Sequence, residues 1–149
     1  MPLSLKNCLT PANVWLTAAI AGLFFVAFYV QAKLLWPYDH VPGISLLFLP
    51  HGVRVLAVLI GRGASIPGLL LGNLAVSWFL FGALGVSEIL ASLLSSVMPF
   101  LALKCIEATT HQSLTDRFNP TRLFGFVLCS AVFNAISHVV LFSLLARYA

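Results

Sequence analysis

Long apolar runs without a charged residue constrain this chain more than any other feature of its sequence. Residues 14–30 carry no charge, and this run approaches the roughly 20 residues with which an α-helix crosses a hydrocarbon core about 30 Å thick. Charged residues make up 8% of the chain, whereas about 25% is usual in a soluble domain. So few charges cannot cover a soluble surface, and disorder would require low hydrophobicity. The sequence therefore predicts a polytopic membrane protein.

Short segments rich in proline, glycine and polar residues separate the apolar runs. No small-x-small cleavage motif follows residues 14–30, so we interpret this run as a retained first span and not as a signal peptide. Residues 1–149 are predicted to form one all-α integral membrane domain, a polytopic transmembrane helical bundle with about five spans. The expected spans cover residues 13–35, 44–61, 65–81, 88–106 and 122–146.

The basic residues are scattered singly, which is typical of topology signals and helix anchors and not of a nucleic-acid-binding surface. With the N-terminus inside, the cytoplasmic side receives Lys6, Arg62, Lys104, Arg117 and Arg122. The opposite side then receives Lys33 and Arg147. This bias predicts a multi-pass protein of a bacterial-type inner (plasma) membrane, with its N-terminus in and its C-terminus out.

Arg54 is the most informative single residue, because it falls inside the second expected span. It lies about 12 Å of helix before the turn expected at Arg62. An arginine near the centre of a spanning helix costs about 2.5–3.5 kcal/mol on insertion scales. Two interpretations are open: the side chain reaches the cytoplasmic headgroups, or it faces the interior, where a polar partner, a lipid head group or an anionic ligand balances it.

The segment Pro50-His51-Gly52 precedes Arg54 and is expected to break or kink the second helix. Proline removes a backbone hydrogen bond, and glycine relaxes the chain. Backbone groups freed at membrane depth must be buried in protein or line a cavity. A new helix start followed by His51 and Arg54 would favour anions, and a simple packing kink is the equal alternative.

Three further polar residues fall at a depth similar to that of Arg54. Asn73 and Asn134 lie roughly 14–18 Å from the cytoplasmic surface, and His138 shares a helix face with Asn134. We expect Glu88 nearer the outer end of its span, away from this polar centre. The hypothetical ligand-binding set is His51, Arg54, Asn73, Asn134 and His138.

Catalytic and cofactor motifs are not apparent in the sequence. Haem ligation by His51 and His138 is the less favoured reading, because their expected depths differ by about 8 Å. The three cysteines, Cys8, Cys105 and Cys129, have no CxxC spacing, and no metal-ligand cluster stands out. We therefore expect neither an enzyme nor a bound cofactor or metal.

Residues 49–73 read LPHGVRVLAVLIGRGASIPGLLLGN. This stretch holds a Pro-x-Gly helix start (Pro50, Gly52), a Gly-Arg turn (Gly61, Arg62), a Pro-Gly helix start (Pro67, Gly68) and a Gly-Asn pair (Gly72, Asn73). In these motifs, and in the order of its later spans over about residues 10–147, the chain resembles the membrane-associated sensor (MASE) type of integral membrane domain. The resemblance implies a sensory input module, of a kind usually fused to a histidine kinase or a cyclic-dinucleotide enzyme.

The MASE-type domains have more spans, so this chain resembles a half-length relative, and no output domain follows Ala149 in the sequence. The leading hypothesis is a sensor-like or small-ligand-binding membrane module that acts in signal transduction through another membrane or signalling protein. The alternatives are a structural or assembly subunit of a larger membrane protein complex and a small transporter subunit. Expected partners are membrane lipids, such a protein and an anionic small ligand, but not nucleic acid.

A reporter fused after Ala149 tests the expected orientation. A reporter that works only outside the cytoplasm should be active there, because the basic-residue bias places the C-terminus outside. Activity of a cytoplasmic reporter at the same position would contradict the five-span, N-in arrangement.

Overall fold

All regular structure described in this chain is helical, as the sequence predicts. The computed structural model describes residues 10–35, 49–82, 84–111, 113–114 and 119–148. Its helices are α1 (Pro11–Val30), extended by the π-helical η2 (Gln31–Leu35), then α2 (Leu49–Gly61), the 3-10 helix η4 (Arg62–Ser65), α3 (Ile66–Phe81), α4 (Val86–Thr110) and α5 (Pro120–Tyr148). The predicted all-α bundle is confirmed.

Local sequence explains several of the helix ends. The Thr10 side chain accepts a hydrogen bond from the Asn13 amide, and Pro11 follows as the first helical residue, where its missing N–H costs nothing. Gly82 ends α3 with φ of 65°, a left-handed conformation that glycine adopts without strain. The expected turn between the second and third spans is present at Gly61 and Arg62.

The chain reverses direction at Arg62, whose φ of 49° turns α2 back onto α3. The reversal is established by one contact: Arg54 Nη2 donates to Asn73 Oδ1 at 3.0 Å. In one straight helix these residues would stand about 28 Å apart. α2 and α3 therefore form an antiparallel hairpin.

The number of candidate spans differs from the expected five. Four helical segments among the described residues are long and apolar enough to cross a membrane: Pro11–Leu34, Leu49–Phe81, Val86–Thr110 and Pro120–Ala146. The difference arises in the segment Leu49–Phe81. This segment is helical throughout but reverses at Arg62, so it holds both the second and the third expected spans. Neither of its arms reaches the roughly 20 residues of a full span, and the predicted residues 44–48 lie outside the described ranges.

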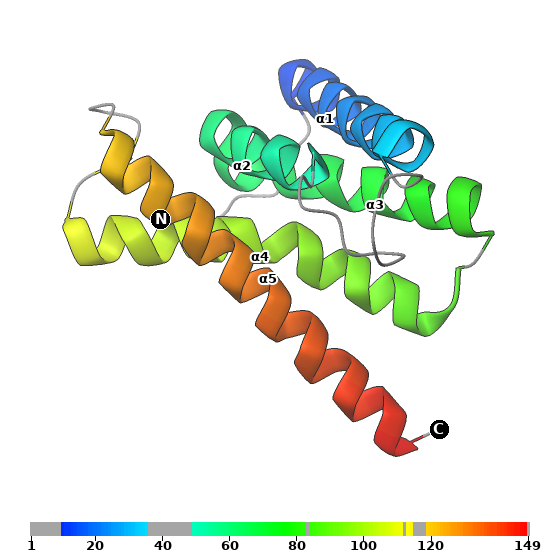
Figure 1. Cartoon of the computed structure of the whole chain (residues 1–149). Coiled ribbons are helices and arrows are strands. Elements are labelled where there is room, and N and C mark those ends of the chain that lie inside the picture. The colour runs from blue at the N-terminus through cyan, green and yellow to red at the C-terminus, as the bar shows by residue number, and fades with distance from the viewer. Residues whose placement is uncertain (1–9, 36–48, 83, 112, 115–118, 149) are drawn as a thin grey trace.

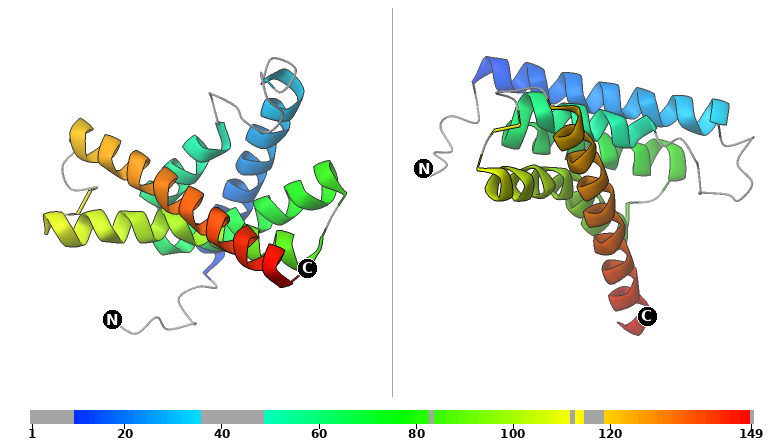
Figure 2. Two further views of the ribbon diagram at one scale, coloured as in Figure 1. Left: turned by 60° about the horizontal axis from the view of Figure 1, so that its bottom comes forward. Right: turned by 60° about the vertical axis from the view of Figure 1, so that its left-hand side comes forward.

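The helices alternate in direction and form a layered bundle. α1 packs on α2 and α3, α4 packs on α3, and α5 packs on α4 (Figure 1). The C-terminal end of α5 projects away from α1, α2 and α3 in the right-hand view of Figure 2. Arg62 and Lys104 meet the same carboxylate, that of Glu107, so these two basic residues share one end of the bundle, as the sequence predicts.

The distribution of side chains is the reverse of that in a soluble protein. Large apolar residues such as Trp15 and Ile60 are 78% and 77% exposed. Polar side chains are buried instead: Gln31, Arg54, Ser65, Asn73, Ser92, Ser95, Ser96 and Ser130. An apolar exterior around an interior that holds polar side chains beside a hydrophobic cluster fits a lipid environment, so the structure supports a multi-pass membrane protein.

Two glycines allow α1 to approach α3 closely. A Cβ at Gly68 would lie 2.8 Å from the Thr17 carbonyl oxygen and 2.9 Å from Ile20 Cβ. A Cβ at Gly72 would lie 3.0 Å from a ring carbon of Phe24. Because these glycines are four residues apart, they form a continuous small-residue strip of the kind that lets membrane helices pack backbone to backbone.

The expected break at Pro50-His51-Gly52 is wrong. α2 is a regular helix from Leu49 to Gly61 and contains all three residues. Pro50 stands in the first turn, where a proline has no helical hydrogen bond to remove. The Leu49 amide donates to Gln31 Oε1 at 2.8 Å, so a side chain from the end of α1 caps the start of α2.

Substitution of Gly68 tests the packing of α1 on α3. Gly68→Ala should lower the free energy of unfolding in detergent by about 1–3 kcal/mol, because the new methyl group overpacks the contact with Thr17 and Ile20. Gly22→Ala is the matched control in α1, since its Cβ would meet nothing within 4 Å. We expect the control to be neutral or slightly stabilising, and equal effects of the two variants would contradict the assignment.

Candidate functional site

The side chain of Arg54 lies inside the bundle. It is 4% exposed, and its guanidinium carbon lies 5.0 Å from the centroid of the Phe24 ring. Its Nη2 donates to Asn73 at 3.0 Å, so α1, α2 and α3 all contribute to its surroundings. Of the two interpretations from the sequence, the structure supports the interior cation and not the side chain that reaches the headgroups.

Asn73 is held in place by its own hydrogen bonds. Its Nδ2 donates to the Leu69 carbonyl oxygen at 2.8 Å and to Ser96 Oγ at 3.3 Å. Ser96 Oγ in turn donates to the Ser92 carbonyl oxygen at 2.7 Å. With both amide hydrogens used, the amide oxygen of Asn73 is fixed towards Arg54.

A second polar contact joins α4 to α5. Ser95 Oγ donates to Asn134 Oδ1 at 3.1 Å. The amide oxygen of Asn134 is therefore an acceptor within the bundle, and the N–H groups of its amide are what it can offer to a ligand. One turn further along α5, the His138 ring stacks on Phe142 with centroids 5.9 Å apart.

These groups surround a pocket of about 270 Å³ to which all five α-helices contribute. We call it the polar pocket. Its lining consists of Phe28, Arg54, Asn73, Val76, Ser77, Phe81, Ser87, Glu88, Ala91, Ser92, Ser95, Asn134, His138 and Phe142.

The structure brings four of the five predicted ligand-binding residues to the polar pocket: Arg54, Asn73, Asn134 and His138. His51 does not line it. Its Nε2 lies 3.5 Å from the Val127 carbonyl oxygen, which makes it a contact between α2 and α5.

The polar pocket extends from Arg54 and Asn73 towards the first turn of α4 and is closed on the other side. Ser87 and Glu88 line it in the first turn of α4, about 10 Å along that helix from Ser95. Beyond Arg54 and Asn73, in the direction of Arg62, lie fully buried residues of a single hydrophobic cluster: Val58, Leu69, Leu103 and Phe126. This layer closes the pocket towards the Arg62 end of the bundle.

Glu88 lies nearer to the polar centre than the sequence suggested, because it lines the same pocket as Arg54. Its carboxylate nevertheless bends back over the start of α4. Glu88 Oε2 accepts from Ser87 Oγ at 2.8 Å and lies 2.6 Å from where a Cβ of Gly85 would stand. This is the position of a capping-box acid at a helix N-terminus, and it accounts for the residue without a ligand.

The Arg62 end of the bundle carries an ionic cluster. Arg62 Nη2 donates to both carboxylate oxygens of Glu107 at 2.7 Å, and Lys104 Nζ lies 3.2 Å from Glu107 Oε2. The cluster ties the turn after α2 to the end of α4. It also explains how Arg62 tolerates a positive φ, a conformation that costs a residue with a side chain about 1 kcal/mol or more.

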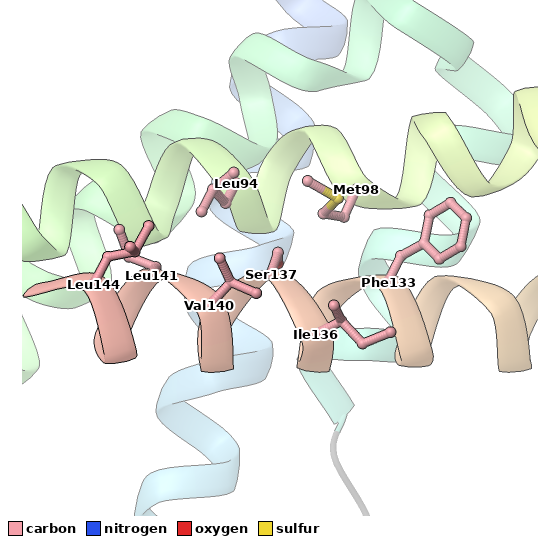
Figure 3. Close-up of a pocket in the computed structure, with 8 residues that line it drawn as sticks. All are labelled: Leu94, Met98, Phe133, Ile136, Ser137, Val140, Leu141 and Leu144. Atoms are coloured by element: carbon pink, nitrogen blue, oxygen red, sulfur yellow. The ribbon is translucent and has the colours of Figure 1, made fainter.

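A second hollow, of about 470 Å³, lies between α4 and α5 (Figure 3). We call it the apolar groove. Leu94 and Met98 from α4 face Phe133, Val140 and Leu144 from α5, and the remaining lining residues are Ile136, Ser137 and Leu141. Among the described lining residues, only Ser137 offers a polar side-chain group for orienting a ligand, and none of them also lines the polar pocket.

The sequence predicted no role for Phe24 or Gln31, and it offered Ser95 and Ser96 only for contact within the bundle or between subunits. A signal for the serines was available, because Ser92, Ser95 and Ser96 recur at helical spacing on one face of α4. The roles of Phe24 and Gln31 depend on neighbours distant in sequence, which periodicity does not reveal.

No protein-family model, curated protein or solved structure matches this chain. The resemblance to MASE-type domains therefore stays a prediction.

Substitution of Asn73 tests the contact that anchors Arg54. Asn73→Leu should cost about 1.5–3 kcal/mol of unfolding free energy, because a buried guanidinium loses an acceptor. Arg54→Leu should cost less, since it removes the charge together with its need for acceptors. The double variant should recover stability relative to Asn73→Leu alone, as measured by unfolding in mild detergent. Equal losses in the two single variants, without recovery, would contradict the proposed role of Asn73.

Proposed function

We propose that this protein is a sensor-like membrane module that binds a small anionic ligand in the polar pocket and acts through a partner protein. The observation that carries the proposal is the position of Arg54. A guanidinium that is 4% exposed lines a pocket formed by all five α-helices. Because arginine keeps its charge at any physiological pH, it supplies a fixed positive charge to this pocket.

The neighbours of Arg54 favour an acceptor-rich ligand group. Asn134 accepts from Ser95 through its oxygen and so presents N–H groups, and Ser92 and His138 add further groups that can donate. In a low-dielectric interior, hydrogen bonds from such donors to an anion are stronger than in water.

The polar pocket is closed towards the Arg62 end of the bundle, which favours a binding module over a transporter subunit. A transport path would continue from Arg54 towards the Arg62 end of the bundle. Instead, Val58, Leu69 and Leu103 are fully buried in the hydrophobic cluster there. With the N-in orientation that the basic residues favour, the Glu88 end of the pocket faces the outside of an inner membrane.

The apolar groove favours a second candidate function, that of a structural subunit in a membrane complex. Its walls are almost entirely hydrocarbon, and the α5 residues Ile136 and Val140, which line it, are 58% and 52% exposed. A partner helix packed there would bury this surface. The two functions are compatible, because the groove and the polar pocket share no residue.

Thermal unfolding of the purified chain in mild detergent tests the proposal. Acetate, benzoate, phosphate and chloride are added separately as sodium salts, and we expect at least one of them to raise the Tm in a saturable manner. Arg54→Leu should remove this shift while the chain still expresses, because the substitution eases membrane insertion. Arg54→Lys should retain part of it, since the charge remains but the fork geometry is lost.

Arg62→Leu is the matched control, because Arg62 is paired with Glu107 and does not line the polar pocket. It should leave the anion-induced shift intact even if it lowers the starting Tm. Absence of any saturable shift in the native chain, or an equal loss in both leucine variants, would contradict anion binding at Arg54.

A further inference from the structure

We propose that the ligand of the polar pocket is a monocarboxylic acid with a compact apolar body, such as a single ring or a short alkyl chain. This inference rests on the proposed function and assigns its ligand class. The donors that line the pocket include Arg54 and Asn134, whereas its apolar walls come from residues further along α1, α3 and α5.

The apolar walls require a ligand with a body. Phe28 and Phe81 form an edge-on pair with centroids 6.0 Å apart, and Phe142 stacks on His138. Val76, which is 3% exposed, and Ala91 also line the pocket. Small-molecule sites combine such apolar walls with a few polar groups that fix orientation.

The size of the pocket points the same way. Its volume is about 270 Å³, whereas an ion the size of a water molecule occupies about 30 Å³. A bare inorganic anion at Arg54 would leave most of the aromatic wall without a partner. A benzoate-sized ligand brings its own apolar surface to that wall while its carboxylate meets the guanidinium.

Charge and geometry favour a carboxylate with a single charge. Among the described residues that line the pocket, Arg54 is the one cation, apart from any charge on His138, and Glu88 adds a negative charge at the outer end. A second ligand charge would therefore lie close to Glu88 or among phenylalanine rings. The planar guanidinium fork matches the two oxygens of a carboxylate.

A ligand with its own ammonium group near Glu88 is the main competing class. The geometry of Glu88 disfavours such a ligand. The carboxylate accepts a hydrogen bond from Ser87 Oγ at 2.8 Å and folds over Gly85 at the start of α4. In that position it stabilises the helix N-terminus, where a negative charge is already favoured.

Binding of matched probes to the full chain in detergent tests the ligand class. Dissociation constants are measured for benzoate, hexanoate, acetate, benzamide, phosphate and phenylalanine. We expect benzoate or hexanoate to bind at least tenfold more tightly than acetate, which has the same head without the body. Benzamide, with the same body and no charge, should bind at least tenfold more weakly than benzoate. Arg54→Leu in the same detergent corrects for partition into micelles.

A pair of variants on α4 tests where the apolar body lies. Ala91→Phe places a ring into the polar pocket and should weaken benzoate at least tenfold while acetate changes less than threefold. Leu93→Phe is the control, because Leu93 is 44% exposed and does not line the pocket. Equal effects of the two variants on benzoate would overturn the placement.

The outcomes separate this inference from the proposed function. If acetate or phosphate binds as tightly as benzoate and needs Arg54, the apolar body is wrong and the anion pocket stands. If phenylalanine binds most tightly and Glu88→Gln weakens it, the ligand is a zwitterion and the monocarboxylate class is overturned. If no probe binds in an Arg54-dependent manner, both the ligand class and the proposed function fail.

Discussion

The interior of this bundle is organised around one buried guanidinium. Placing Arg54 inside a membrane bundle costs several kcal/mol unless its N–H groups find acceptors, and the amide oxygen of Asn73 is one, at 3.0 Å. For that contact to form, the chain must reverse between the two residues, with arms of nearly equal length on either side of Arg62. Asn73 also donates a hydrogen bond to Ser96 Oγ, so the same side chain fixes α4 against α3. The burial of the Arg54 charge, the position of the turn and the register of the helices are therefore set together by the contacts of Asn73.

Polar and small residues carry this specificity because apolar contacts in lipid cannot. Lipid tails are as apolar as leucine, so burial against another helix brings little gain by itself. Close packing at Gly68 and Gly72 holds α1 to α3, and hydrogen bonds hold α2, α3 and α4 together. α5 is joined by Ser95–Asn134 and by the longer His51 contact, and it crosses the other helices obliquely (Figure 1).

The sequence predicted the parts of this arrangement that depend only on helix rise. Counting about 1.5 Å per residue placed Arg54 and Asn73 at one depth, and the structure joins them. The prediction from residue type failed at Pro50, because this proline, which was expected to break a helix, stands in the first turn of α2. The cap that Gln31 provides at Leu49 and the backward bend of Glu88 are tertiary effects and could not be counted along the chain.

The placement of the pocket also bears on how binding could reach a partner. A ligand shifts a conformational equilibrium only by contacting the two states differently. Arg54 and Asn73 belong to the part of the bundle that polar contacts hold most closely, whereas Asn134 and His138 belong to α5. An anion that bridges the two groups would add a polar contact between α5 and the α2–α3 hairpin, beside the 3.5 Å contact of His51 with Val127. The other side of α5 lines the apolar groove, so the proposed ligand and a membrane partner would act on the same element.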